Sequence, residues 1–332
     1  MPFIWEQIVD LTYKRKFVIV RPEEAPRVAE QHFLDLRKKY VAVLAIDLVN
    51  KYGGEGRLSK KFAGSVQNLL SDDVRYVHFD FHKVCGHIHF ERLSVLYNQI
   101  TDFLEKNGYL LLNEKGEKMK EQTGVVRTNY IDCLDRTNVT QSMIGRRMLE
   151  LQLRRIGIFS AKETISSHPN FDDSFKILWA SHGDDISIQY SRTPALKGDF
   201  VRYHLMDLVW SVDIMNDLWN ALVRYYLNNF CDGTKLDAID LLQGHYIVSV
   251  SRGMTPQSQK AGLAAIASFP LALSLILIGF FLAIVSLRQV SYGYWHLFFS
   301  LMWASISIGI AAIVRANGRI FCNRPHLLKP RS

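Results

Sequence analysis

The chain has 332 residues, of which 48% are hydrophobic, and its 40 basic and 32 acidic side chains give a formal net charge of +8 at pH 7. This composition allows a sizeable core in one large domain or two ordinary ones, and it excludes a wholly disordered chain. Four widely separated cysteines without a Cys-x-x-Cys pair argue against a disulfide framework and a structural zinc site, and no nucleic-acid-binding motif accompanies the positive charge.

Strand and helix patterns alternate through the first part of the chain. Residues 40–49 form a nearly continuous apolar run, which predicts a buried strand, and residues 74–81 predict a second strand. Apolar residues then recur at helical spacing, and the predicted helix stops at Asn107-Gly108. The residues on its apolar face are Leu93, Leu96, Tyr97, Ile100 and Leu104.

A hairpin is predicted after this helix. Residues 109–112 are followed by a turn at residues 114–117 and then by the strand that contains Val125, so the two strands are expected to pair. A later amphipathic helix covers residues 214–225 and ends near Gly233. The sum of these patterns predicts an α/β fold, with a mixed sheet and flanking helices.

A run of histidine and acidic residues lies at and after the second predicted strand. The spacing fits no zinc motif, and the first three residues are expected to alternate on one face of the strand, which favours a structural role. No metal or other cofactor is therefore predicted. The residues concerned are His78, Asp80, His82, Cys85, His87 and His89.

Residues 127–138 read Arg-Thr-Asn-Tyr-Ile-Asp-Cys-Leu-Asp-Arg-Thr-Asn, and they lie between the strand at Val125 and a helical pattern that starts near Thr140 and stops at Gly157. A helix that begins there directs free backbone N–H groups and the positive end of its dipole toward the loop. Arg136 adds a planar guanidinium that suits phosphate oxygens. The segment therefore predicts a phosphate loop before a helix, of the kind found in cysteine-dependent phosphatases.

The position of the cysteine decides which chemistry such a loop supports. Cysteine-dependent phosphatases have a Cys, five further residues and an Arg, so that a thiolate lies beneath the phosphorus. Counted back from Arg136, the nucleophile position is Tyr130, whereas Cys133 is only three residues before the arginine. A phenol has a pKa of about 10, against about 8.5 for a thiol, and it is bulkier. The expected property is phosphate binding without efficient cleavage.

Other side chains of the segment are candidates for proton transfer and phosphate binding. Asp132 or Asp135 could donate a proton to the leaving oxygen, or either could cap loop amides or pair with an arginine. Thr137 and Asn138 could bind phosphate or cap the helix. The candidate catalytic residues are Tyr130, Asp132, Asp135 and Arg136, and the candidate phosphate-binding residues are Arg127, Arg136, Thr137 and Asn138.

With one substitution, Tyr130, residues 127–138 resemble the signature of the Sac-domain phosphoinositide phosphatases, Arg-x-Asn-Cys-x-Asp-Cys-Leu-Asp-Arg-Thr-Asn. The resemblance extends over about residues 3–252. It implies removal of a phosphate from an inositol ring, with phosphatidylinositol 4-phosphate as the expected lipid, through a phosphocysteine and without a metal. Further matches are Trp5-Glu6-Gln7, Phe79-Asp80-Phe81-His82, Gln189-Tyr190, Ala195-Leu196-Lys197 with Asp199, and Arg224-Tyr225-Tyr226-Leu227-Asn228-Asn229-Phe230.

Two further departures from the family pattern stand beside Tyr130. Members usually carry an N-terminal Sac subdomain and the first part of the catalytic subdomain before the segment that matches Trp5. They also carry a basic stretch where this chain has residues 204–208, His-Leu-Met-Asp-Leu. The resemblance therefore leaves open an active phosphatase, a catalytically impaired or inactive phosphoinositide-binding pseudophosphatase, and a partial sequence of a longer protein.

Two long uncharged runs follow Lys260. Each is long enough to span a hydrocarbon core of about 30 Å, and the second begins with aromatic residues typical of the membrane interface. Lysine and arginine are more frequent outside the pair than in the short connection, which predicts both chain ends in the cytosol. The predicted organisation is a partial Sac catalytic domain (1–233), a connector (234–260), two transmembrane helices (261–287 and 293–314) and a basic cytosolic tail (315–332).

The expected partners follow from the loop and the apolar runs. They are phosphoinositide lipids and the membrane bilayer, and no nucleic acid is expected. The resemblance, together with the two-span tail, implies an integral membrane protein of the endoplasmic reticulum or the Golgi, with the Sac domain in the cytosol.

Overall fold

The computed structural model describes residues 1–12, 15–86, 89–196, 210–244, 256–289 and 293–325. Its internal contacts divide the chain into two compact units, Met1–Glu6 with Val18–Ala221, and Gln7–Phe17 with Leu222–Ser332. Several residues singled out in the sequence lie outside the described residues. These are His87, Lys197, Asp199 and the stretch 204–208.

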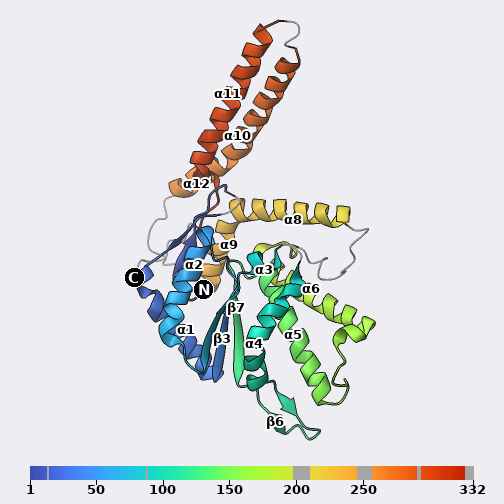
Figure 1. Cartoon of the computed structure of the whole chain (residues 1–332). Helices are drawn as coiled ribbons and strands as arrows, with labels where there is room; N and C mark the ends of the chain where they lie inside the picture. Colours follow the sequence, from blue (N-terminus) through green and yellow to red (C-terminus); the bar gives the residue numbers. More distant parts are fainter. Residues whose placement is uncertain (13–14, 87–88, 197–209, 245–255, 290–292, 326–332) are drawn as a thin grey trace. The chain divides into compact units, whose positions relative to one another are not determined.

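The first unit contains a three-stranded parallel sheet in the order β4-β3-β7 (Figure 1). β3 (Ala42–Asp47) is central and all six of its residues are buried, as the apolar run predicts. β4 (Val74–His78) and β7 (Gly124–Asn129) flank it, and Asp47 is in register with the last residue of each. The prediction of a mixed sheet is wrong for this sheet, because a helix lies between successive strands and brings the chain back in the same direction.

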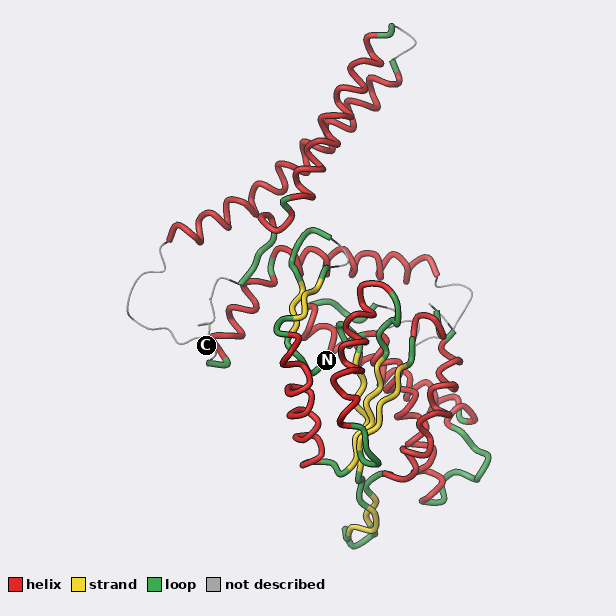
Figure 2. The backbone as a smooth tube through the Cα atoms, turned by 60° about the vertical axis from the view of Figure 1, so that its left-hand side comes forward, coloured by secondary structure: helices red, strands yellow, loops and turns green. Residues whose placement is uncertain are grey.

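Helices cover both faces of the parallel sheet (Figures 1 and 2). On one face, Phe33 and Phe62 of the first two helices stack with ring centroids 6.5 Å apart. On the other face, Leu44 and Ile46 join Leu96 in a buried cluster. The described helices that lie wholly within this unit are α1 (Ala25–Lys39), α2 (Gly53–Val66), α3 (Phe81–Cys85), α4 (Leu93–Asn107), α5 (Asp135–Arg155) and α6 (Pro169–Ser191), with the 3-10 turns η1 (Pro22–Glu24), η2 (Gln67–Leu69), η3 (Phe90–Arg92) and η4 (Ile165–Ser167).

The hairpin that follows α4 differs from the prediction. β5 (Leu111–Leu112) pairs with β6 (Lys118–Lys120), not with β7, which pairs with β3. The side chain of Asn113 closes the turn by accepting hydrogen bonds from two backbone N–H groups. β6 is exposed at all three residues, whereas β7 is buried or half-buried along its length, where it pairs with the buried strand β3.

The second unit contains the two long apolar helices, α10 (Pro256–Arg288) and α11 (Trp295–Ala316), which pack along each other (Figure 1). Residues 268–288 and 295–316 are long and apolar enough to cross a membrane. Only 11% of the most apolar window in each helix is buried, which is unlike a core helix of a soluble protein. Pro270 lies inside α10, near the start of the first of these spans.

A hydrogen-bonded network lies beside the ends of the apolar helices in this unit. The side chain of Asn323 donates to the carbonyl of Phe230 and to Thr234, and its backbone N–H donates to the carbonyl of Asn229. Arg15 donates to the carbonyl of Asn228 at 2.7 Å. The Sac-like motif at residues 224–230 therefore has a structural role within this unit. The remaining elements are β1 (Trp5–Gln7), which pairs with β2 (Phe17–Ile19), α8 (Trp210–Phe230), α9 (Asp232–Leu242) and α12 (Gly318–Phe321).

Small side chains allow the two apolar helices to approach closely. Ser300 donates its hydroxyl to the carbonyl of Ala283 at 2.9 Å, and a Cβ atom at Gly279 would clash with Oγ of Ser307. We expect Gly279→Leu to destabilise the pair by about 1–3 kcal/mol, the usual cost of overpacking. Thermal unfolding in detergent micelles would measure the loss.

A matched control lies on the neighbouring helix. Gly309 is exposed, and a Cβ atom added there would meet no other atom within 4 Å, so Gly309→Leu should leave the melting temperature unchanged. Equal melting temperatures for the two leucine variants would contradict the close contact at Gly279.

Candidate active site

The candidate site lies where the three parallel strands end. Loops leave the carboxyl ends of β3, β4 and β7 on the same edge of the sheet, and each leads into a helix, α2, α3 and α5 respectively. In open α/β sheets, ligands bind outside this edge. The segment 130–134 is the loop after β7, so the fold places it where side chains from three loops can meet.

A buried carboxylate organises this edge of the sheet. Asp47, at the end of β3, is fully buried and accepts hydrogen bonds from Ser59 at 2.6 Å, Tyr76 at 3.1 Å and Asn129 at 2.7 Å. These donors come from α2, β4 and β7, so one side chain connects the helix and both neighbouring strands. The backbone N–H of Val49 adds a fourth hydrogen bond. The start of the candidate loop is thereby attached to the central strand.

The loop after β7 is tight. Cys133 has a left-handed backbone conformation, with φ of 57°, and its exposed thiol accepts a hydrogen bond from the N–H of Tyr130 and donates one to its carbonyl. Asp132 is exposed and its carboxylate accepts from the N–H of Leu134 at 3.4 Å. Cys133 therefore closes the loop on itself.

The helix after the loop begins earlier than the periodicity indicates. α5 starts at Asp135 rather than near Thr140, so Arg136 lies in its first turn. An apolar pattern cannot reveal a helix start whose first residues are polar. The carboxylate of Asp135 at this position interacts favourably with the helix dipole. The helix ends at Arg155, and Gly157 follows with φ of 82°, as the stop signal predicts.

The side chain of Tyr130 contacts the guanidinium group of Arg136. Arg136 donates a hydrogen bond to the phenol oxygen, and its guanidinium carbon lies 4.3 Å from the centroid of the Tyr130 ring. The phenol in turn donates to the carboxylate of Glu55 at 3.3 Å, and that carboxylate also accepts from Asn50 at 2.6 Å. Four side chains, from the loops after β3 and β7 and from the first turns of α2 and α5, are thus in contact.

The surroundings of Tyr130 keep its phenol protonated. Burial raises the pKa of Tyr130 above its ordinary value, the positive charge of Arg136 opposes this rise, and the nearby carboxylates of Glu55 and Asp132 add to it. A phenolate is therefore rare at neutral pH, and the neutral phenol is a poor nucleophile.

The other candidate phosphate ligands are occupied by neighbouring helices. Arg127 donates to His32 of α1 at 3.0 Å and to Asn129 at 2.8 Å, and burial lowers its pKa although Cys133 and Asp47 oppose the change. Asn138 donates to the carbonyl of Trp179 and its oxygen lies 3.0 Å from Nδ1 of His182, both on α6.

The buried side chain of Thr137 forms no hydrogen bond within the described residues. Of the predicted site residues, Tyr130 and Arg136 are in contact. Asp132 lies on the same loop, and Asp135 is the first residue of α5. Arg127 and Asn138 form hydrogen bonds with α1 and α6 respectively.

Sequence reasoning missed Glu55, Asn50 and Asp47. The only signal was their place at or just after the end of a buried strand, between Asp47 and Glu55, where ligand-binding loops of parallel sheets begin. Contact with Tyr130 depends on which strand lies next to β3, and the sequence pattern does not specify this neighbour.

The histidine-rich segment has a structural explanation. β4 ends at His78, so the predicted alternation on one strand face does not continue to Asp80 and His82. His78 contacts the carbonyl of Val49 at 2.9 Å through Nε2. Asp80 caps α3 through the N–H of Lys83 and also accepts from the N–H of Lys51. Within the ranges that the structure describes, no three His, Cys, Asp or Glu side chains are grouped as a metal site.

The fold and the site define a protein of mixed helix and sheet in which loops at the carboxyl ends of parallel strands gather ionisable side chains. A family model described as SacI homology domain matches residues 1–86. Phosphoinositide phosphatase SAC6 of Arabidopsis thaliana is 72% identical over 332 residues, which are 100% of this chain and 56% of the relative. Phosphoinositide phosphatase SAC7 of the same plant is 69% identical, over 100% of this chain and 55% of the relative.

More distant relatives agree. Phosphatidylinositol-3-phosphatase SAC1-A of Danio rerio is 34% identical over 99% of this chain and 55% of its own length. The chain is therefore similar over its whole length to the Sac-domain phosphoinositide phosphatases. It spans about half the length of the curated relatives that it matches.

Proposed function

We propose that the chain is a phosphoinositide phosphatase that removes phosphate from phosphatidylinositol phosphates, with phosphatidylinositol 4-phosphate as the first substrate to test. The observation that carries the proposal is Arg136 in the first turn of α5, at the end of a segment that matches the Sac signature in all but one fixed position. The names of the relatives support the same reaction class.

In this proposal the loop and the helix start divide the chemical tasks. Arg136 and the free N–H groups of α5 hold the phosphate oxygens, and Asp132 or Asp135 supplies the proton to the leaving inositol oxygen. With the neutral phenol of Tyr130 at the nucleophile position, a water molecule attacks the phosphorus as the bond to the inositol oxygen breaks. Asp132 is the more exposed of the two carboxylates. No metal or cofactor takes part. Thr137, Asn138 and Arg127 support the loop and its helix through the contacts described above.

The proposed location is a membrane. The apolar helices form two transmembrane segments, at 261–287 and 293–314, that anchor the partial Sac domain (1–233) through a connector (234–260). α9 forms part of this connector. The Sac domain, both chain ends and the basic tail (315–332) lie in the cytosol by the distribution of lysine and arginine, with the endoplasmic reticulum or Golgi as the proposed organelle.

One observation favours a second function. Because the phenol of Tyr130 contacts Arg136 where a phosphate would bind, the chain could serve as a catalytically impaired pseudophosphatase that retains a phosphoinositide-binding loop. Both functions use the same phosphate-binding loop, but only the phosphatase cleaves its substrate efficiently.

The test is release of inorganic phosphate from vesicles that contain phosphatidylinositol 4-phosphate or, since one relative is named a 3-phosphatase, phosphatidylinositol 3-phosphate. We expect slow turnover by the purified chain and a further loss of about 100-fold in Arg136→Ala, because a charge-stabilising donor is removed. Arg75→Ala, which removes a guanidinium paired with exposed Asp102, should leave the rate unchanged. Absence of turnover by the chain on either lipid would favour the pseudophosphatase.

A further inference from the structure

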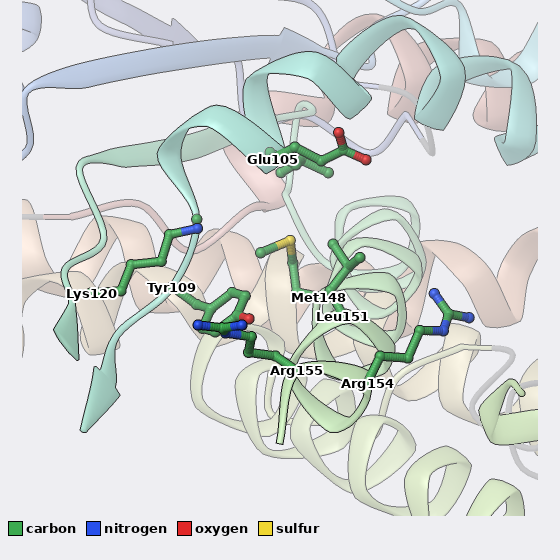
Figure 3. Close-up of a pocket in the computed structure, with 9 residues that line it drawn as sticks. Glu105, Tyr109, Lys120, Met148, Leu151, Arg154 and Arg155 are labelled. Atoms are coloured by element: carbon green, nitrogen blue, oxygen red, sulfur yellow. The ribbon is translucent and has the colours of Figure 1, made fainter. Parts of the chain in front are cut away.

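A cavity of about 410 Å³ lies at the far end of α5 from the candidate site (Figure 3). Its walls come from the last turns of α4, from the second half of α5, and from Tyr109 and Lys120 around the β5–β6 hairpin. Small-molecule sites in proteins have volumes of about 300–1,000 Å³. The cavity is therefore large enough for a small organic ligand.

The cavity is distinct from the candidate active site. Arg136 lies in the first turn of α5 and Arg155, which lines the cavity, is the last residue of the same helix. At 1.5 Å per residue the two positions are about 28 Å apart along the helix axis. A ligand in the cavity therefore touches neither the phenol of Tyr130 nor the carboxylate of Glu55.

One wall of the cavity is apolar and continuous with the core. Leu104 of α4 is only 6% exposed and belongs to the main hydrophobic cluster, and Met148 of α5 packs against the same cluster. Leu151 follows on the same side of α5 (Figure 3). An apolar group of a ligand that covers this wall would remove from water both its own carbon surface and that of the wall. Such burial is the main source of affinity in small-molecule sites.

The rim of the cavity is strongly basic. Lys120, Arg154 and Arg155 line it, against a single carboxylate from Glu105. Among the described residues, neither Lys120 nor Arg155 forms an ion pair, although Lys118, two residues away, pairs with Glu121 at 2.9 Å. The ammonium of Lys120 lies 5.1 Å from the centroid of the Tyr109 ring. The local excess of positive charge would attract an anion.

Helix-end electrostatics explain only part of this charge. Arg154 and Arg155 are in the last turn of α5, where basic residues commonly interact with the helix dipole. Arg154 also donates to the carbonyl of Glu163 at 2.7 Å. Lys120 is in a strand of the hairpin, so the dipole of α5 does not account for its place on the rim. Two cations from different elements thus face one apolar wall.

We propose that this cavity binds an organic anion in which a phosphate-type group is attached to an apolar moiety. Lys120 and Arg155 would contact the anionic oxygens, and Leu104, Met148 and Leu151 would contact the apolar part. Arginine suits such oxygens because its planar fork can donate two parallel hydrogen bonds. The same chemistry is found in soluble phosphate esters and in the headgroup region of short-chain phosphatidic acid.

The experiment uses the full chain in nanodiscs of neutral phosphatidylcholine, with the methionine methyl groups labelled with carbon-13. Met148→Leu assigns the methyl signal of Met148. Phenylphosphonate, whose phosphorus–carbon bond is not cleaved by phosphatases, is the soluble probe, and dihexanoyl phosphatidic acid is the lipid probe. We expect a saturable shift of the Met148 signal and a Kd for phenylphosphonate about tenfold or more below that for inorganic phosphate.

Matched variants locate the binding. Lys120→Glu combined with Arg155→Glu should raise the Kd about tenfold or more, because two attractive charges become repulsive. Lys118→Glu, on the same strand, and Arg136→Ala, at the other end of α5, should leave it unchanged. A shift with phenylphosphonate alone would identify a soluble ligand class, and a shift with phosphatidic acid as well would extend the class to lipids.

Three results would overturn the proposal. They are the absence of a Met148 shift at millimolar probe, equal affinity for inorganic phosphate and phenylphosphonate, and a loss of binding in Arg136→Ala instead of the double variant. The last result would place the anion at the loop, so it would support the proposed phosphatase site while rejecting the cavity. The outcome of the phosphatase assay has no bearing on this experiment.

Discussion

Tyr130→Cys should increase phosphate release from phosphatidylinositol 4-phosphate by about 100-fold or more. The substitution places a thiol at the nucleophile position, with five residues between it and Arg136, and removes a phenol whose pKa is raised by burial. A thiolate near the first turn of α5 is a strong nucleophile, because the helix dipole and the guanidinium both favour the anion. The substitution also frees Arg136 from its contact with the Tyr130 ring and hydroxyl.

Two companion variants separate these effects. Tyr130→Gly frees Arg136 without adding a nucleophile, so it should bind phosphate but stay as slow as the unmodified chain. Adding Arg136→Ala to Tyr130→Cys should remove the gain, by about 100- to 1,000-fold, since the guanidinium stabilises the charge that develops on the phosphoryl group. Equal rates for Tyr130→Gly and Tyr130→Cys would exclude a phosphocysteine step. A silent Tyr130→Cys variant that still binds phosphate would support the pseudophosphatase.

Asp47→Ala is expected to lower the free energy of unfolding by about 3–5 kcal/mol, because three buried or half-buried donors lose their acceptor. The carboxylate is fully buried, and its removal leaves the hydroxyl groups of Ser59 and Tyr76 and the amide of Asn129 without their acceptor. Each unsatisfied buried group costs about 1–3 kcal/mol. Thermal and chemical denaturation of the purified chain would measure the change.

The control for this variant is an exposed carboxylate. Asp73 pairs with Arg37 at 3.3 Å, and both side chains are more than 40% exposed, so Asp73→Ala should cost at most about 1 kcal/mol. Asp47→Asn should have an intermediate effect, because it keeps one acceptor oxygen. Equal stability of Asp47→Ala and Asp73→Ala would contradict the role assigned to the buried carboxylate.

Periodicity and stop signals predicted the elements that are defined by neighbouring residues in the chain or by a long apolar run. The buried strand β3 is recognisable from its apolar run alone, and α4 ends just before Gly108, which has φ of 61° and therefore suits glycine. The two apolar helices follow from length and lack of charge. Strand pairing was predicted less well, since β5 pairs with β6 and β7 pairs with β3.

The candidate site depends partly on the local sequence and partly on contacts that form only in the folded chain. The spacing between Tyr130 and Arg136 is a property of the sequence, because both residues lie on one short loop and the helix that follows. The contact of Tyr130 with Glu55 and the network around Asp47 arise only in the folded chain, because they join residues more than 70 positions apart, or strands that become neighbours only in the sheet. Local pattern therefore determined the chemistry that the loop contains, and tertiary structure alone decided what surrounds it, since side chains from separate strands meet only when the sheet has formed.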